Sequence, residues 1–87
     1  MGRITWRGGT AKKETKGPLA VHVGQQLLKL RAKHQLSLKA LSEASSISCA
    51  FLCDVENGRS MPSIETVWKL ATYFEVPIGY FVRGFEP

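Results

Sequence analysis

Hydrophobic residues recur at helical spacing along most of this chain. Val23, Leu27 and Leu30 follow one another at steps of four and three residues and form one apolar stripe, which ends near His34. Such a stripe is typical of an amphipathic helix that packs one side against a core. The pattern predicts a first helix over residues 20–34.

Three further helices are predicted from the same period and from capping residues. Ser37, Ser48 and Ser63 each precede a stretch of helical spacing. A serine hydroxyl at this position accepts a hydrogen bond from a free backbone N–H of the first turn. The predicted helices cover residues 38–45, 49–56 and 64–74. Asn57 and Gly58 end the middle one of these, because both residues tolerate a positive φ.

The last of these helices has a clear apolar stripe. We expect its buried side to consist of Ile64, Val67, Leu70, Ala71 and Phe74. Pro77 begins a short fifth helix that runs to Val82, since proline is well tolerated in a first helical turn. A strand-like period of two residues occurs only at Ile4–Trp6, so the chain is predicted to be all-α with five short helices.

The helix predicted over residues 49–56 has an unusual outer side. Its bulky residues Phe51, Leu52 and Val55 share the side that we assign to the core. The opposite side carries Cys49, Ala50, Cys53, Asp54 and Asn57. Solvated helix sides usually carry Lys, Glu and Arg, whereas short polar side chains let a helix backbone approach another surface. Two interpretations stay open: this side reads base edges in the DNA major groove, or it packs against a partner protein.

The charge is unevenly distributed. The 87 residues carry a formal net charge of +5, which points to nucleic acid or another anionic surface. Residues 1–18 hold five basic residues against Glu14, a net +4, whereas residues 19–87 hold seven basic and six acidic residues, a net +1. We therefore expect a flexible basic N-terminal arm, residues 1–19, that precedes one compact domain, residues 20–87.

The sequence lacks the features of several other classes of protein. It has no secretory signal pattern and no run of about 20 apolar residues that would cross a membrane. The two cysteines are expected to be thiols rather than a disulfide. No Ser/His/Asp set, phosphate-binding glycine loop or zinc-ligand spacing is present. We expect a cytoplasmic, nucleoid-associated protein that is not an enzyme and holds no metal or cofactor.

An ordered set of residues carries a family resemblance. Its members are Val23-Gly24, Leu27, Leu30-Arg31, Leu36-Ser37, Leu41, Ile47-Ser48, Leu52, Val55-Glu56-Asn57-Gly58-Arg59 and Pro62-Ser63-Ile64-Glu65-Thr66. On these residues the chain resembles the helix-turn-helix family of phage Cro and repressor proteins, also called the xenobiotic-response-element (XRE) family. The resemblance implies a lambda-repressor-like, five-helix DNA-binding domain whose third helix enters the major groove.

The resemblance also implies which residues meet DNA. Bases would be read by Ser48, Cys49, Ala50, Cys53 and Asp54. Phosphates would be held by Ser37, Lys39, Asn57, Gly58 and Arg59. Lys39 would supply a phosphate contact where Leu38 replaces the glutamine that is usual in the family. Arg31 would pair with Glu56 and brace the first helix against the third.

The roles of Asp54 and of the two cysteines on this base-reading side each have two possible interpretations. Asp54 either accepts a hydrogen bond from a cytosine amino group or is a charge partner for Lys39 or Arg59 that lowers affinity. Cys49 and Cys53 are four residues apart and therefore neighbours on a helix. They form either a thiol switch or simply two small residues.

Two further surfaces are predicted to bind partners. The arm would contact DNA through Arg3, Arg7, Lys12, Lys13 and Lys16. The C-terminal end holds more apolar side chains than a domain of this size can bury, so a dimer interface is expected at Tyr80, Phe81 and Phe85.

The sequence thus predicts a sequence-specific regulator of transcription, a repressor that binds double-stranded DNA at an inverted-repeat operator as a homodimer. Two alternatives come from other classes. One is an antitoxin-type module whose main partner is another protein. The other is an accessory DNA-binding subunit of a mobile element.

Overall fold

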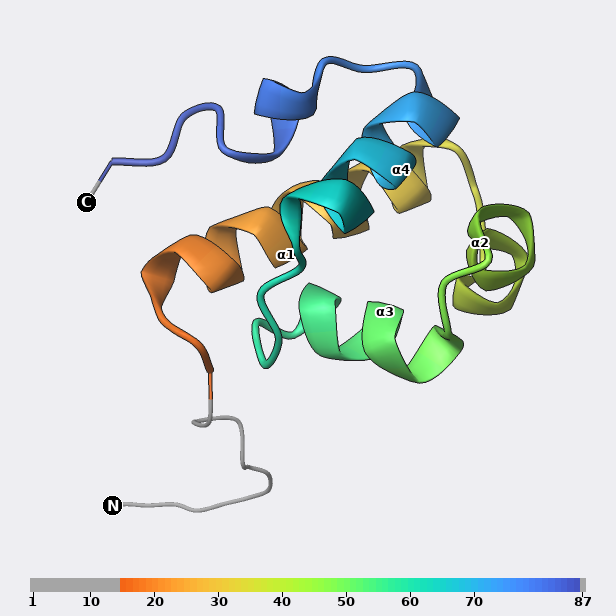
Figure 1. The fold of residues 1–87 in the computed structure, drawn as a ribbon, viewed down its shortest axis with the longest axis horizontal. Coiled ribbons are helices and arrows are strands. Elements are labelled where there is room, and N and C mark those ends of the chain that lie inside the picture. Colours follow the sequence, from red (N-terminus) through yellow and green to blue (C-terminus); the bar gives the residue numbers. More distant parts are fainter. Residues whose placement is uncertain (1–14, 87) are drawn as a thin grey trace.

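The computed structural model describes residues 15–86, which fold into four α-helices and a short 3-10 helix (Figure 1). The elements are α1 (Pro18–Lys33), α2 (Leu38–Ser45), α3 (Cys49–Glu56), α4 (Ile64–Phe74) and η1 (Ile78–Phe81). The four main predicted helices are confirmed, and the described part of the chain is all-α. None of its helices combines the length and apolar character needed to cross a bilayer.

The fifth predicted helix is a single 3-10 turn rather than an α-helix. Its backbone bonds join residues three apart, as in the bond from the Tyr80 N–H to the Pro77 carbonyl at 2.9 Å. Gly79 lies within this segment and Gly84 follows it, and both disfavour a longer helix. The predicted strand at Ile4–Trp6 lies outside the described residues.

The serine caps explain where the helices begin. The hydroxyls of Ser37, Ser48 and Ser63 accept hydrogen bonds from the N–H groups three residues on, at 3.0, 3.1 and 3.2 Å. Each bond satisfies one of the backbone donors that a first helical turn leaves free. All three predicted caps are therefore confirmed. At α1, Pro18 occupies the first helical turn instead, so this helix starts two residues earlier than predicted.

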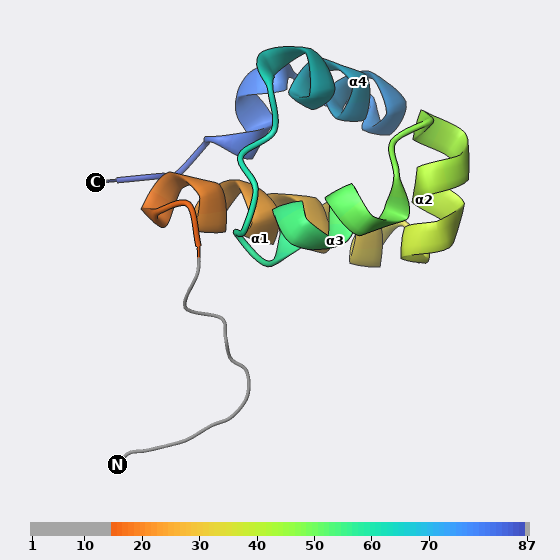
Figure 2. The same cartoon turned by 60° about the horizontal axis from the view of Figure 1, so that its bottom comes forward.

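The helices are arranged in two layers around one core. Figure 2 shows α1 and α3 side by side, with α4 and η1 above them and α2 across one end. The core consists of Val23, Leu27, Leu30, Leu41, Leu52, Val55, Val67, Leu70, Ala71, Phe74 and Phe81. Four of the five residues predicted for the buried side of α4 lie in it. Ile64 was predicted there wrongly: its side chain is 73% exposed, because it starts α4 where no other element covers it.

Ser46, which ends α2, has a left-handed backbone (φ 61°, ψ 27°) that a residue with a side chain disfavours. We predict that Ser46→Gly raises the free energy of unfolding by about 0.5 kcal/mol, because relief of this strain exceeds the freedom that glycine adds to the unfolded chain. Ala44→Gly, at an exposed position within α2, is the control and should lower it by about 1 kcal/mol. Urea denaturation measures both, and a similar loss in each variant would contradict the prediction.

Candidate nucleic-acid interface

α2 and α3 form a helix-turn-helix whose turn is fixed by serine hydroxyls. Ser42 Oγ donates to the Ile47 carbonyl at 2.6 Å, and the Ile47 N–H donates to Ser45 Oγ at 3.3 Å. Leu41 and Leu52 pack beneath the turn, and both side chains are fully buried. These contacts set the angle between the two helices and leave one side of α3 on the outside of the molecule (Figure 1).

The outer side of α3 has the composition that the helical wheel predicts. Leu52 and Val55 are buried on the inner side. The five predicted base-reading residues, Ser48, Cys49, Ala50, Cys53 and Asp54, are all exposed or half-buried. None of these side chains is longer than that of aspartate, so the backbone of α3 can approach a surface closely. A helix of this kind fits the width of the DNA major groove.

Gly24 lets α1 and α3 lie in direct backbone contact. A Cβ atom at this position would lie 2.1 Å from the Val55 carbonyl oxygen and 2.9 Å from that of Glu56. Only a residue without a side chain permits this approach. The sequence does carry a signal for this contact, because a glycine in the middle of a predicted helix indicates either lost stability or a close neighbour. The contact fixes the position of α3 on the domain.

An ion pair joins α1 to α3 beside this contact. Arg31 Nε and Nη2 donate to the two carboxylate oxygens of Glu56 at 2.6 and 3.0 Å, and Nη1 donates to the Leu36 carbonyl at 2.8 Å. The side chains are only 18% and 8% exposed. The hydrogen bond to Glu56 is the main cause that raises the pKa of Arg31. A bidentate pair at this burial orients the helices more than it stabilises the fold.

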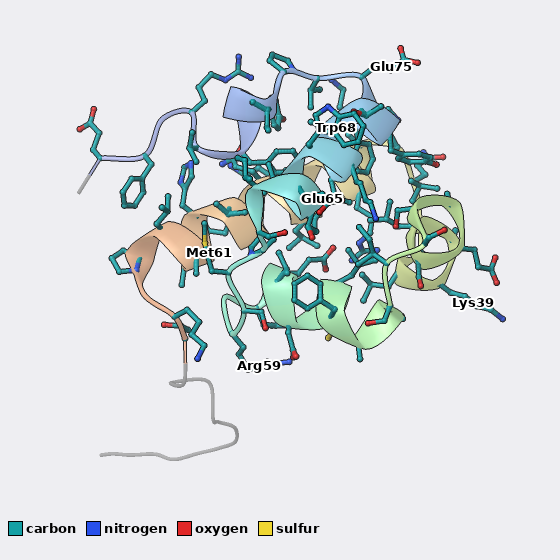
Figure 3. The ribbon with its side chains drawn as sticks, in the orientation of Figure 1. Lys39, Arg59, Met61, Glu65, Trp68 and Glu75 are labelled. Atoms are coloured by element: carbon teal, nitrogen blue, oxygen red, sulfur yellow. The ribbon has the colours of Figure 1, made fainter. Side chains whose placement is uncertain are left out.

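The predicted phosphate-binding residues lie beside the two ends of α3. Figure 3 shows Lys39, on α2, and Arg59, in the loop after α3, on either side of this helix. The Ser37 hydroxyl accepts the capping bond and keeps its own proton for donation. Asn57 is less available, because its amide Nδ2 already donates to the Cys53 carbonyl at 2.8 Å.

The loop after α3 also holds the segment that leads into α1. Gly58 has a φ of 74°, which favours glycine, and a Cβ there would lie 2.8 Å from Val21 Cγ2. The Lys16 N–H donates to the Gly58 carbonyl at 2.8 Å. This bond was not foreseen, because residues 16 and 58 are far apart in the sequence. The other predicted arm residues, Arg3, Arg7, Lys12 and Lys13, lie outside the described part of the chain.

Asp54 on the outer side of α3 is paired with Arg59. Arg59 Nη2 and Nε both donate to Asp54 Oδ1, at 2.8 and 3.1 Å. The two side chains are 42% and 40% exposed. The hydrogen bond to Asp54 is the main cause that raises the pKa of Arg59. Of the two charge partners considered for Asp54, the structure therefore contains the pair with Arg59.

The two cysteines are free thiols. Cys49 is exposed, and Cys53 is half-buried with its Sγ 3.6 Å from Asn57 Nδ2. Among residues 15–86, no three His, Cys, Asp or Glu side chains gather closely enough to hold a metal ion.

The C-terminal residues are less exposed than the predicted dimer interface requires. Phe81 is 1% exposed and belongs to the core, because η1 folds back onto α1 and α4. Tyr80 is half-buried, with the Arg83 guanidinium 4.7 Å from its ring centre. Phe85 is half-buried against the His22 ring at 5.5 Å. Phe81 was thus wrongly predicted as an interface residue.

A different apolar surface is exposed, which we call the α4–η1 surface. Its residues are Met61, Ile64, Trp68, Ile78 and Val82, which are 40–73% exposed. All but Trp68 line a groove of about 310 Å³ between α4, η1 and the loop before α4. Met61 and Trp68 are labelled in Figure 3. The predicted stripe of α4 already omits Trp68, whereas the exposure of Ile64 was not predicted.

Comparison with known proteins places this geometry among helix-turn-helix proteins. The HTH_3 family model, described as Helix-turn-helix, matches residues 27–81. The HTH-type transcriptional regulator SutR of Escherichia coli is 38% identical over 64 residues, which are 74% of this chain and 36% of SutR. DdrOP3, an HTH-type transcriptional regulator of Deinococcus deserti, is 36% identical over 62 residues, which are 71% of this chain and 48% of DdrOP3. The chain thus spans less than half the length of either relative.

A solved structure of similar size shares the fold. The crystal structure of the restriction-modification controller protein C.AhdI from Aeromonas hydrophila is similar with a TM-score of 0.68 and 29% sequence identity. The similarity covers 71% of this chain and 94% of C.AhdI.

Proposed function

Because the chain belongs to the Cro and phage-repressor type (XRE, HTH_3) helix-turn-helix family of DNA-binding transcriptional regulators, we propose that it is a sequence-specific repressor that binds an inverted-repeat operator as a homodimer. The outer side of α3 is the observation that carries this proposal, since short side chains let the helix enter the major groove. Gly24 and the Arg31–Glu56 pair hold that helix rigidly on α1. Repression needs no further site, because a bound dimer blocks access to the DNA that it covers.

The DNA contacts divide into two kinds. We assign base reading to Ser48, Cys49, Ala50, Cys53 and Asp54 and phosphate binding to Ser37, Lys39, Asn57, Gly58 and Arg59. Cys49 and Ala50 suit apolar contact with a thymine methyl group. The arm adds Arg3, Arg7, Lys12, Lys13 and Lys16. The bond from Lys16 to Gly58 supports this, because it starts the arm beside Arg59 at the end of α3.

Selection from a random DNA library tests the proposal. The expected product is an inverted repeat whose half-sites lie about 34 Å apart, one helical turn, as the two-fold symmetry of such dimers requires. Recovery of no motif, together with binding that disappears at moderate salt, would contradict it.

We place the dimer interface on the α4–η1 surface. Exposed, contiguous apolar side chains around a groove are typical of an interface, and a two-fold dimer brings the same surface of each subunit together. Ile64→Asp should shift the protein from dimer to monomer in sedimentation velocity, because a desolvated carboxylate opposes association. Leu28→Asp is the matched control: Leu28 is 44% exposed on α1, outside this surface, and the variant should remain dimeric. A dimeric Ile64→Asp variant would place the interface elsewhere.

A further inference from the structure

Arg59 is bound to Asp54 by three hydrogen bonds. Its backbone N–H donates to the Asp54 carbonyl at 2.8 Å, and Nη2 and Nε donate to Oδ1 at 2.8 and 3.1 Å. The guanidinium therefore lies along the outer side of α3, beside Asp54, rather than extending away from the domain. This is the side on which the predicted base-reading residues lie.

The pair determines which donors of Arg59 remain available. A guanidinium has five N–H donors in a rigid plane. Asp54 takes the edge formed by Nε and Nη2, and within the described residues Nη1 donates no hydrogen bond. The other donors lie at the end of the group, where Nη1 and Nη2 carry two parallel N–H bonds. Two parallel donors at this spacing match the N7 and O6 acceptors of guanine in the major groove.

The charge of the pair favours a base over a phosphate. A phosphate attracts a free cation, but here a carboxylate lies 2.8 Å from Nη2 and repels a second anion at the same place. Guanine N7 and O6 are neutral acceptors and meet no such repulsion. Asp54 also restricts the side chain of Arg59 to one orientation, which lowers the conformational entropy lost when DNA binds.

We propose that Arg59 reads a guanine through the Nη1 and Nη2 edge and that Asp54 is the positioning residue that aims it. The inference rests on the proposed function and replaces the phosphate role of Arg59 and the direct base contact of Asp54 with one coupled role. The site recognises one G·C pair in each half-site. Without Asp54, Arg59 is a free cation that binds phosphates of any sequence.

The test compares the base preferences of the full-length wild type and four variants, by library selection and by competition against random DNA. Arg59→Ala should lose about tenfold or more of its discrimination at one G·C pair in each half-site. Arg59→Lys keeps the charge but not the two parallel donors, and should lose the same discrimination. Asp54→Ala should reduce the base discrimination at the same G·C pair and should bind random DNA more tightly. The double variant, with both residues changed to alanine, should discriminate no worse than Arg59→Ala alone.

The outcomes separate this inference from the proposed function. A phosphate contact predicts that Arg59→Ala weakens all sequences equally and that Arg59→Lys restores them, which would overturn the inference alone. If Asp54→Ala loses discrimination at a different base pair, the inference is overturned as well, since Asp54 would then read a base of its own. If the wild type itself selects no motif, the proposed function fails and the inference fails with it. Both side chains are about two-fifths exposed, and circular dichroism checks that each variant is folded.

Discussion

Gly24→Ala is expected to lower the free energy of unfolding by about 3 kcal/mol. The added methyl group would lie 2.1 Å from the Val55 carbonyl oxygen and 2.9 Å from that of Glu56. Both neighbours are backbone atoms, so no side-chain rotation relieves the clash, and α1 and α3 must move apart. A domain of this size has a total stability of only about 5 kcal/mol. The variant should therefore keep only about 2 kcal/mol, a folded-to-unfolded ratio of about 30 to 1, and should unfold at a much lower urea concentration than the wild type.

Gly79→Ala is the matched control for this prediction. No atom lies within 4 Å of a Cβ at Gly79, and its backbone φ is one that alanine accepts. Its free energy of unfolding should change by less than about 0.5 kcal/mol. Chemical denaturation followed by circular dichroism measures both variants, at one protein concentration low enough to keep them monomeric, because Gly79 lines the groove of the α4–η1 surface. Equal stability of the two would show that α1 and α3 can separate without loss, against the close approach that the structure shows.

The helices of this domain were predictable because their signals are local. A serine cap and the apolar residues that follow it lie within a few positions of one another, as at Ser48 and Leu52. The periodicity likewise separated the buried side of α3 from its outer side. The residues at which a helix begins and ends depend mainly on such short-range features, so the boundaries of α2, α3 and α4 agree with the prediction.

The features that were predicted wrongly or not at all depend on contacts between residues far apart in the sequence. Ile64 has the right spacing for a buried stripe, but whether it is covered depends on the position of η1. Phe81 is as apolar as Phe85, yet only Phe81 enters the core. The close approach at Gly24 requires α3 as a partner, which no periodicity within α1 reveals. For the candidate site, the sequence therefore predicted which residues lie on the outer side of α3 but not the hydrogen bonds between them.

Deletion of residues 1–14 is expected to flatten the salt dependence of DNA binding by about 3 units of log affinity per decade of salt. The segment carries four basic residues, Arg3, Arg7, Lys12 and Lys13. Each phosphate that they neutralise releases condensed counterion, with a slope of about 0.9 per contact. The deletion ends before Lys16, so its bond to Gly58 and the start of α1 stay intact. A loss of DNA affinity in this variant is then due to the missing arm residues and not to a disturbed domain.

Operator and random DNA should both lose affinity, because phosphate contacts carry no base information. The advantage of the full chain should shrink by about a thousandfold for each tenfold rise in salt. A full-length variant with glutamine at the four basic positions is the control, since it removes the charge and keeps the length. If charge is what binds, the truncated and the substituted proteins should share one slope, below that of the wild type. If the truncated protein keeps the wild-type slope, the arm does not touch DNA, and the phosphate contacts are confined to residues that flank α3.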